Sequence, residues 1–187
     1  WPESAVPFYY DHTPALAEEL REMVRRRQVY LLFGNDDLER PRDGNERAFV
    51  GAKMLSPGGE LVLRYHKIQL VPFGEYVPLH ALLTLGGRVS AKLVERVSDF
   101  TPGHEAAVGE VDGHPVGGFI FYESVFPHLV RRFSAQGAQL LVNMTNDAWY
   151  GRTSAPYQHL AMSAFRAVEN RRTLVRAANT GITAIVD

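Results

Sequence analysis

The stretch "GGFIFYES", residues 117–124, reads as a buried strand that ends abruptly on polar side chains. Three apolar residues in a row are typical of a strand in the interior of a sheet. Tyr122, Glu123 and Ser124 follow them without an intervening turn. Because functional side chains in α/β proteins gather where strands end, we predict a strand over Val116–Phe121 and a functional site at its carboxyl end.

The chain after this strand alternates between helical and strand patterns. We predict, in order, a helix over Phe126–Phe133, a strand over Leu140–Met144, a helix over Gln158–Arg171, and strands over Leu174–Ala178 and Ile182–Val186. Ala161, Ala164, Phe165 and Val168 share one face of the longer helix. The alternation predicts an α/β fold in which the strand ends and the loops after them carry the site.

The chain before residue 116 carries fewer regular patterns. Three elements are predicted there: a surface helix from Thr13-Pro14 to Arg27, a strand over Val29–Phe33, and a hairpin with arms at Ala48–Leu55 and Leu61–Tyr65. The stretch from His80 to Phe100 mixes glycine, basic and apolar residues without a clean period, and we predict that it is partly helical.

Composition narrows the class of protein. The 187 residues include 20 basic and 21 acidic side chains, so the net charge of -1 does not indicate a nucleic-acid partner. The chain has no cysteine, which excludes disulfides, thiolate metal sites and thiol nucleophiles. The seven histidines show no ligand spacing, and we expect neither a metal nor a cofactor. No apolar stretch reaches the roughly 18 residues that span a bilayer, so we expect these residues to be soluble and any membrane anchor to lie outside them.

Charged and amide side chains recur at the predicted strand ends. Glu3, Lys67, Glu75, Glu123 and the pair Asn146-Asp147 all occupy such positions. Glu75 lies between two prolines in an apolar segment, where a carboxylate is partly desolvated and needs a cationic partner such as Lys67. This pair is interpreted either as part of a catalytic site or as a structural ion pair.

Four motifs together resemble one known family. They are "WPES" (1–4), "YHKIQLVPFGEYVPL" (65–79), "FYESVFP" (121–127) and "LLVNMTNDAWYGRTSAPYQHLAMSAFRAVENRRTLVRAANTGITA" (140–184). Their residues and their order along the chain are similar to those of the nitrilase-type, or carbon-nitrogen hydrolase, domain of the apolipoprotein N-acyltransferases. The resemblance implies a four-layer α-β-β-α sandwich and a single domain over residues 1–187. It also implies that this domain is incomplete at both ends and that membrane helices flank it in the family.

The resemblance assigns roles to particular residues. Glu3 matches the general base of the family, Lys67 the lysine that stabilises the tetrahedral intermediate, and Glu75 a second, supporting glutamate. Tyr122 and Glu123 match the two residues after the nucleophilic cysteine, so that Phe121 occupies the position of the nucleophile. A phenylalanine has no atom that forms a thioester, and its ring is bulky enough to fill the place of an acyl carbonyl.

Three functions are therefore weighed. The first is the reaction of the family, transfer of an acyl chain from a phospholipid through a cysteine thioester to the N-terminal amine of a lipoprotein, here impaired at Phe121. The second is an inactive relative that binds lipid or lipoprotein, and the third is an amide hydrolase of the nitrilase group. Ser124, Thr145 and Ser4 are weak candidates for a replacement nucleophile, because no histidine base is evident beside them.

The resemblance also implies a location and a membrane contact. Family members act at the periplasmic face of the bacterial inner membrane, with a phospholipid as acyl donor and a lipoprotein as acceptor. Asn146 and Trp149 follow the predicted strand over Leu140–Met144 and are taken as supporting residues of the site. The aromatic pair Trp149-Tyr150 is interpreted as a cap on the core, with contact to lipid as the alternative.

Overall fold

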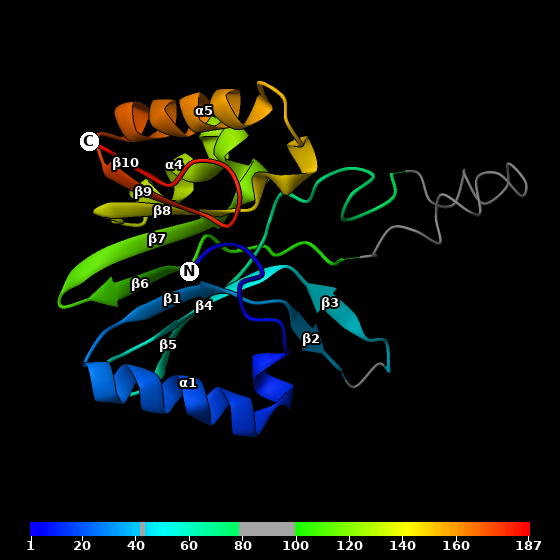
Figure 1. Ribbon diagram of the computed structural model, residues 1–187, viewed down its shortest axis with the longest axis vertical. Coiled ribbons are helices and arrows are strands. Elements are labelled where there is room, and N and C mark those ends of the chain that lie inside the picture. Colours follow the sequence, from blue (N-terminus) through cyan, green and yellow to red (C-terminus); the bar gives the residue numbers. More distant parts are fainter. Residues whose placement is uncertain (42–43, 79–99) are drawn as a thin grey trace, which may run out of the picture.

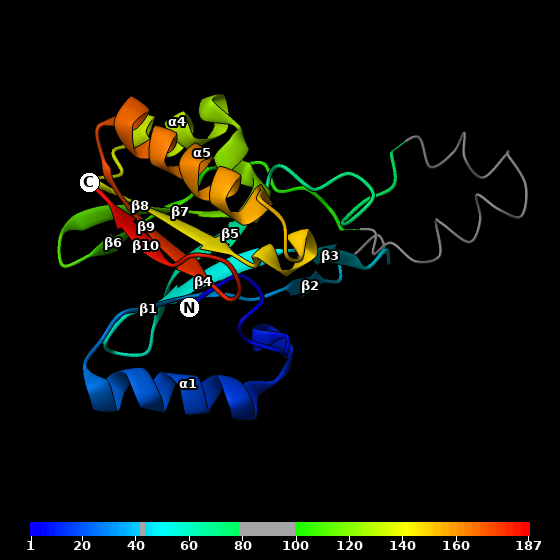
Figure 2. The same ribbon diagram turned by 45° about the horizontal axis from the view of Figure 1, so that its top comes forward.

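Two β-sheets packed face to face between outer helices make up the structure, a computed structural model that describes residues 1–41, 44–78 and 100–187. From one side to the other, the layers are α1, a three-stranded sheet, a five-stranded sheet, and the pair α4 and α5 (Figure 1). The view in Figure 2 shows the same separation of the layers. The four-layer sandwich that the motifs imply is therefore confirmed. The predicted partly helical stretch lies outside the described residues up to residue 99.

The first sheet has the order β1-β4-β5 and is antiparallel throughout. Its elements, with those around it, are η1 (Tyr10–His12), α1 (Pro14–Arg27), β1 (Leu31–Gly34), β2 (Asp37–Glu39), β3 (Arg47–Phe49), β4 (Gly51–Leu55) and β5 (Leu61–His66). Val24 of α1 packs with Phe33 and Leu55 in one buried cluster, so that α1 covers the outer face of this sheet. The predicted hairpin is present, but its first arm is divided, because β3 pairs with β2 instead.

The second sheet has the order β10-β9-β8-β7-β6. Its elements are β6 (Val108–Val111), β7 (His114–Ile120), η2 (Phe121–Val125), α4 (Pro127–Ala135), β8 (Leu140–Thr145), η3 (Asp147–Tyr150), α5 (Ala155–Asn170), β9 (Thr173–Ala178) and β10 (Ala184–Val186). The neighbours β7, β8 and β9 run parallel. Their carboxyl ends therefore meet at one edge of the sheet, and η2 and η3 begin there.

The main core lies where the sheets and α4 meet. Phe119 of β7, Met144 of β8 and Ala52 of β4 are fully buried or nearly so in one cluster. Tyr65 of β5 reaches across to Phe133 of α4, with ring centroids 5.5 Å apart. Burial of this apolar surface is what holds the two sheets in a fixed relation, and this relation places the strand ends opposite one another.

Two details differ from the prediction. The strand that was predicted to end at Phe121 ends at Ile120, because Phe121 turns into the left-handed region with φ of 45°. The strand β6 was not predicted, although Asp112-Gly113 before β7 is a strong signal for a hairpin. Within the described ranges, no helix is both long and apolar enough to cross a membrane.

The long helix α5 turns the opposite face inward from the one its pattern suggests. Phe165 and Val168 are 61% and 68% exposed. The side chains that α5 buries are those of His159, Ser163 and Arg166, together with Ala167. A helix that buries polar residues needs polar partners in the layer below, and those partners lie next to the site.

Candidate functional site

Glu3 reaches the site on the short segment that precedes α1. The Gly34 amide donates a hydrogen bond to the Pro2 carbonyl oxygen at 3.2 Å, and the Val6 amide donates to the Gly34 oxygen at 3.2 Å. A Cβ at Gly34 would lie 2.5 Å from the Pro2 oxygen and 2.7 Å from the Glu3 Cα. Glycine at the end of β1 therefore allows the segment to lie against the sheet, with Glu3 buried.

Lys67 follows β5 directly and is completely buried. Its Nζ lies 2.5 Å from Glu75 Oε1 and 3.5 Å from Glu3 Oε1, so one ammonium serves two carboxylates. The ion pair between Lys67 and Glu75 that the sequence suggested is thus present. Glu75 is fixed in turn by the Val71 amide, which donates to its Oε2 at 2.9 Å. We call Glu3, Lys67 and Glu75 the carboxylate–lysine cluster.

The charge balance of this cluster sets the protonation of Glu3. Burial raises the pKa of Glu3 to about 7, and the charge of Lys67 opposes that rise without cancelling it. The Asn146 amide donates to Glu3 Oε2 at 3.0 Å and stabilises the ionised form. A carboxylate whose pKa lies near neutrality accepts and returns a proton readily, which is the property of a general base.

Phe121 faces this cluster from the other sheet. Its ring is 4% exposed, and its centroid lies 5.2 Å from Lys67 Nζ and 5.6 Å from the centroid of the Tyr150 ring. A left-handed backbone is rare for a bulky residue and costs on the order of 1–2 kcal/mol. The sharp turn points the ring of Phe121 toward Lys67.

Glu123 is the anchor of this turn rather than a member of the cluster. It is fully buried, and Oε1 accepts hydrogen bonds from the Tyr65 hydroxyl at 2.7 Å and from the amides of Ile68 and Gln69 at 2.7 and 3.1 Å. Its Oε2 accepts from the Ile120 amide at 2.7 Å. Burial raises the pKa of Glu123, while the hydrogen bonds from Tyr65, Ile120 and Gln69 and the charge of Lys67 oppose the rise. The glutamate thus joins the end of β7 to the segment that carries Lys67.

A cavity of about 510 Å³ opens beside Phe121. The residues lining it are Val71, Pro72, Phe73, Gly74, Glu75, Phe121, Tyr122, Trp149 and Tyr150. Most of them are apolar or aromatic, and two of them, Phe73 and Trp149, are largely exposed at 58% and 79%. The interpretation of the aromatic pair as a cap on the core is therefore wrong for Trp149, whereas Tyr150 packs against the core cluster.

The structure brings most of the predicted site residues to one place. Glu3, Lys67, Glu75 and Phe121 form a continuous set of contacts, and the cavity lies beside them. The other predicted residues have supporting positions. Tyr122 packs on Phe126, and Glu123 anchors the turn. Asn146 binds Glu3, and Trp149 lines the cavity.

The three candidate replacement nucleophiles have other partners or lie in the interior. The Ser4 hydroxyl donates to Asp36 Oδ1 at 3.1 Å, and the Thr145 hydroxyl donates to Asp147 Oδ1 at 3.0 Å. Ser124 is fully buried, and its Oγ has no hydrogen-bond partner among the described residues. In the ranges that the structure describes, no group of three acidic or histidine side chains is placed to hold a metal ion.

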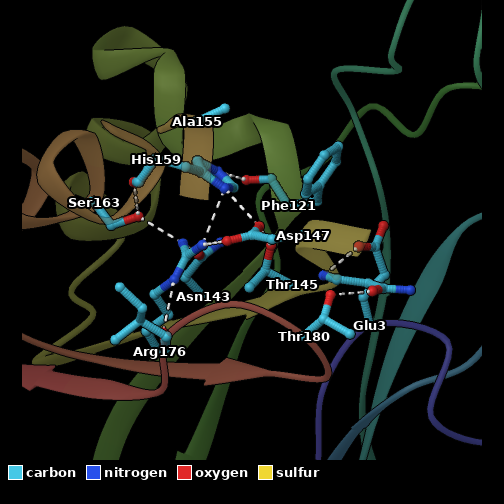
Figure 3. Close-up of polar contacts among 12 residues, drawn as sticks. Glu3, Phe121, Asn143, Thr145, Asp147, Ala155, His159, Ser163, Arg176 and Thr180 are labelled. Carbon is cyan, nitrogen blue, oxygen red and sulfur yellow. Dashed lines mark hydrogen bonds and ion pairs between the residues drawn. The ribbon is translucent and has the colours of Figure 1, made fainter. Parts of the chain in front are cut away.

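A set of buried polar residues beneath Phe121 was not predicted. His159, Asp147 and Arg176 contact one another, and His159 also contacts the main chain of Phe121 (Figure 3). His159 showed no ligand spacing in the sequence, and it was not among the predicted site residues. The available signal was Asn143, a polar residue in the middle of an otherwise apolar strand, which needs a buried partner.

Comparison with known proteins identifies similar chains. The profile of the carbon-nitrogen hydrolase family matches residues 1–187. Proteins named apolipoprotein N-acyltransferase are 46% identical in Geobacter metallireducens and 39% identical in both Brucella melitensis and Chlorobaculum tepidum, each over 100% of this chain. The chain covers 35%, 35% and 38% of those proteins, so it spans about a third of their length.

Solved structures of an amidase from Nesterenkonia sp. share the fold. One of them, a variant with an acetamide moiety added covalently at the active site cysteine, is 26% identical with a TM-score of 0.64, and the match covers 95% of this chain and 60% of that one. Another, a crystal structure of the same amidase, is 25% identical with a TM-score of 0.63 over 95% of this chain and 60% of the amidase chain.

Proposed function

This chain belongs to the carbon-nitrogen hydrolase family, and on that premise we propose that it is the acyl-transfer domain of a lipoprotein-modifying protein in which Phe121 blocks the reaction. The observation that carries the proposal is the contrast between the charged residues of the site and the residue at position 121. The carboxylate–lysine cluster is complete, and the turn at Phe121 aims at it, yet the residue at that turn has no nucleophilic atom. Its relatives are named apolipoprotein N-acyltransferases, and it is similar to them along all its residues.

The proposed chemistry follows from the positions of the cluster when a thiol stands at residue 121. Glu3 accepts the thiol proton, and the sulfur attacks the ester carbonyl carbon of a phospholipid. Lys67 faces the oxyanion that forms, and Glu3 returns the proton to the oxygen of the departing lysophospholipid. The N-terminal amine of a lipoprotein then attacks the thioester carbonyl carbon and loses a proton to Glu3. The carbon–sulfur bond breaks, and Glu3 returns the proton to the departing sulfur, which restores the thiol. Phenylalanine cannot carry out the first of these steps.

A second candidate is non-catalytic binding of lipid at the same place. The cavity beside Phe121 has apolar walls, and the exposed rings of Phe73 and Trp149 stand at its rim. Such a rim suits contact with acyl chains or with an interface. The third candidate, amide hydrolysis, needs the same thiol that the chain lacks, and it is ranked last.

The test is the intact mass of the protein after incubation with phospholipid vesicles, using the protein expressed with any flanking segments that its gene encodes. We compare the parent with Phe121→Cys and with the matched control Phe121→Ala, which makes the same space without a thiol. The expected result is an acyl adduct on Phe121→Cys alone. An adduct on the parent would overturn the proposed block at Phe121, and a folded Phe121→Cys protein without any adduct would overturn the acyl-transfer assignment.

A further inference from the structure

A buried charged network lies directly beneath Phe121 and takes no part in the proposed chemistry. It consists of Asp147, His159, Arg176, Asn143 and Ser163, and we call it the Asp147 network (Figure 3). All five side chains are nearly or fully buried. Burying an aspartate and an arginine removes both charges from water, and this desolvation destabilises the fold unless the two groups pair closely.

Asp147 is the centre of this network. Its Oδ2 lies 2.8 Å from Arg176 Nη2, and its Oδ1 lies 2.9 Å from His159 Nδ1. The second nitrogen of the guanidinium, Nη1, donates to Ser163 Oγ at 2.9 Å and to Asn143 Oδ1 at 2.5 Å. The strands β8 and β9 of the five-stranded sheet, together with η3 and α5, are thereby tied to one carboxylate.

The network meets the site through the other nitrogen of His159. Nε2 lies 3.0 Å from the main-chain carbonyl oxygen of Phe121. A carbonyl oxygen only accepts hydrogen bonds, so Nε2 carries the proton in this contact. The imidazole also packs edge-on against the Phe121 ring, with centroids 5.2 Å apart. The peptide after Phe121 is held where the left-handed backbone places it.

The Asp147 network is also linked to Glu3, through the neighbouring residue Asn146. Asp147 begins the turn η3, whose N-cap Asn146 donates its amide to Glu3. The Asp147 amide donates to the Thr180 carbonyl oxygen at 3.2 Å, and the Thr180 hydroxyl donates to Asn146 Oδ1 at 3.0 Å. One rigid unit therefore touches residue 121 on one side and Glu3 on the other.

We propose that His159 is a positioning residue, which Asp147 and Arg176 hold so that its Nε2–H fixes the carbonyl group of residue 121 and thereby aims the side chain at that position toward Glu3 and Lys67. The consequence for acyl transfer rests on the proposed function, whereas the geometry does not. If the network served only stability, the reactivity of a side chain at position 121 in the folded protein would not depend on which imidazole nitrogen was preserved.

Two amide substitutions separate these roles, because each preserves one nitrogen of the imidazole. In His159→Gln, the side-chain amide reaches the position of Nε2 and retains the donor to the carbonyl of residue 121. In His159→Asn, the amide reaches the position of Nδ1 and retains only the contacts on the side of Asp147 and Arg176. Both substitutions remove the aromatic ring and leave a neutral amide, so their effects on core packing are similar.

Both substitutions are made together with Phe121→Cys, and the introduced thiol reports on the geometry without any lipid. The thiolate displaces iodide from iodoacetamide, the thiol proton passing to Glu3 or to water, and intact mass gives the rate as a function of pH. Urea unfolding, monitored in parallel, reports stability. We expect His159→Gln to remain within about threefold of the Phe121→Cys rate and His159→Asn to fall at least about tenfold.

Equal alkylation rates in the two folded variants would overturn the proposal and leave the network a structural role. If the rates differ as expected but vesicles give no acyl adduct, the positioning role stands and the proposed function fails. Should His159→Asn not fold, the parent protein supplies the decision through the ¹⁵N chemical shifts of the His159 ring. A protonated Nε2 supports the proposal, and an unprotonated Nε2 overturns it.

Discussion

The two halves of the site differ in what they retain. The carboxylate–lysine cluster has every charged group in place, with two carboxylates around one buried ammonium. The turn at Phe121 has the backbone geometry and the anchor Glu123, but a benzyl group stands where chemistry would need a nucleophile. Under the proposed function, geometry, charge and the reactive atom are thus separable properties of this site, and Phe121 lacks only the reactive atom.

This difference has an energetic consequence. Buried charges and a left-handed phenylalanine both destabilise a fold unless other contacts compensate. A site whose only role was packing would gain stability from an apolar cluster instead. The carboxylate–lysine cluster and the turn at Phe121 can be substituted separately, so the effect of each half on activity and stability can be measured by itself.

The largest effect, on the rate of acyl-adduct formation, is expected from removing the ammonium group of Lys67. In the Phe121→Cys background, Lys67→Met removes the group that faces the oxyanion, and we expect adduct formation from vesicles to slow by about 100- to 1,000-fold. The matched control is Lys53→Met, since Lys53 is equally buried but pairs with Asp37. Its folded fraction should form the adduct at the rate of Phe121→Cys. Equal slowing by both substitutions would show that Lys67 acts through stability alone.

The anchor of the turn should matter next. Glu123→Gln keeps the size of the side chain. It places an NH₂ group, which donates hydrogen bonds, opposite backbone amides that also donate. We expect a loss of about 3–4 kcal/mol in the free energy of unfolding, measured in urea at pH 7. A loss below about 1 kcal/mol would mean that Glu123 is protonated and already donates a hydrogen bond.

The pH dependence of stability tests the cluster through Glu3. The pKa of Glu3 is raised from 4.5 to about 7 in the folded chain, so the neutral acid is favoured on folding. Its contribution is fully present below pH 4.5 and is lost as the pH rises through 7. We expect the stability of the parent relative to Glu3→Gln to fall by about 3 kcal/mol between pH 4.5 and pH 8. Parallel pH profiles for the two proteins would refute the raised pKa.

The smallest effect concerns the loop that packs on Asp147. Gly181 has φ of 98°, and a Cβ there would lie 2.9 Å from the Cβ and Cγ of Asp147. Gly137 has nearly the same φ of 99°, with open space around it. Gly137→Ala should therefore cost about 1 kcal/mol from backbone strain alone, and Gly181→Ala about 1 kcal/mol more. Equal losses of unfolding free energy would show that the loop yields without disturbing Asp147.

The site was predictable where its residues belong to local patterns. Glu75 between prolines and Lys67 at a strand end signalled an ion pair that the structure contains. The assignment of Phe121 to the position of the family's nucleophile came from the resemblance and stays a prediction. The contact between the Asn146 amide and Glu3 joins residues 143 positions apart, and no local pattern announces it. His159 was missed for the same reason, since its partners come from β9, η3 and η2.

The sequence by itself determined the alternation of strands and helices, the absence of a thiol and the presence of a glutamate, a lysine and a second glutamate in fixed order. Local periodicity and side-chain chemistry are enough for these conclusions. Only the tertiary structure decided that α5 buries His159 and exposes Phe165, and that one ammonium serves two carboxylates. Which face of an element is buried depends on what the neighbouring layer offers, and burial in turn sets the strength of every charge interaction.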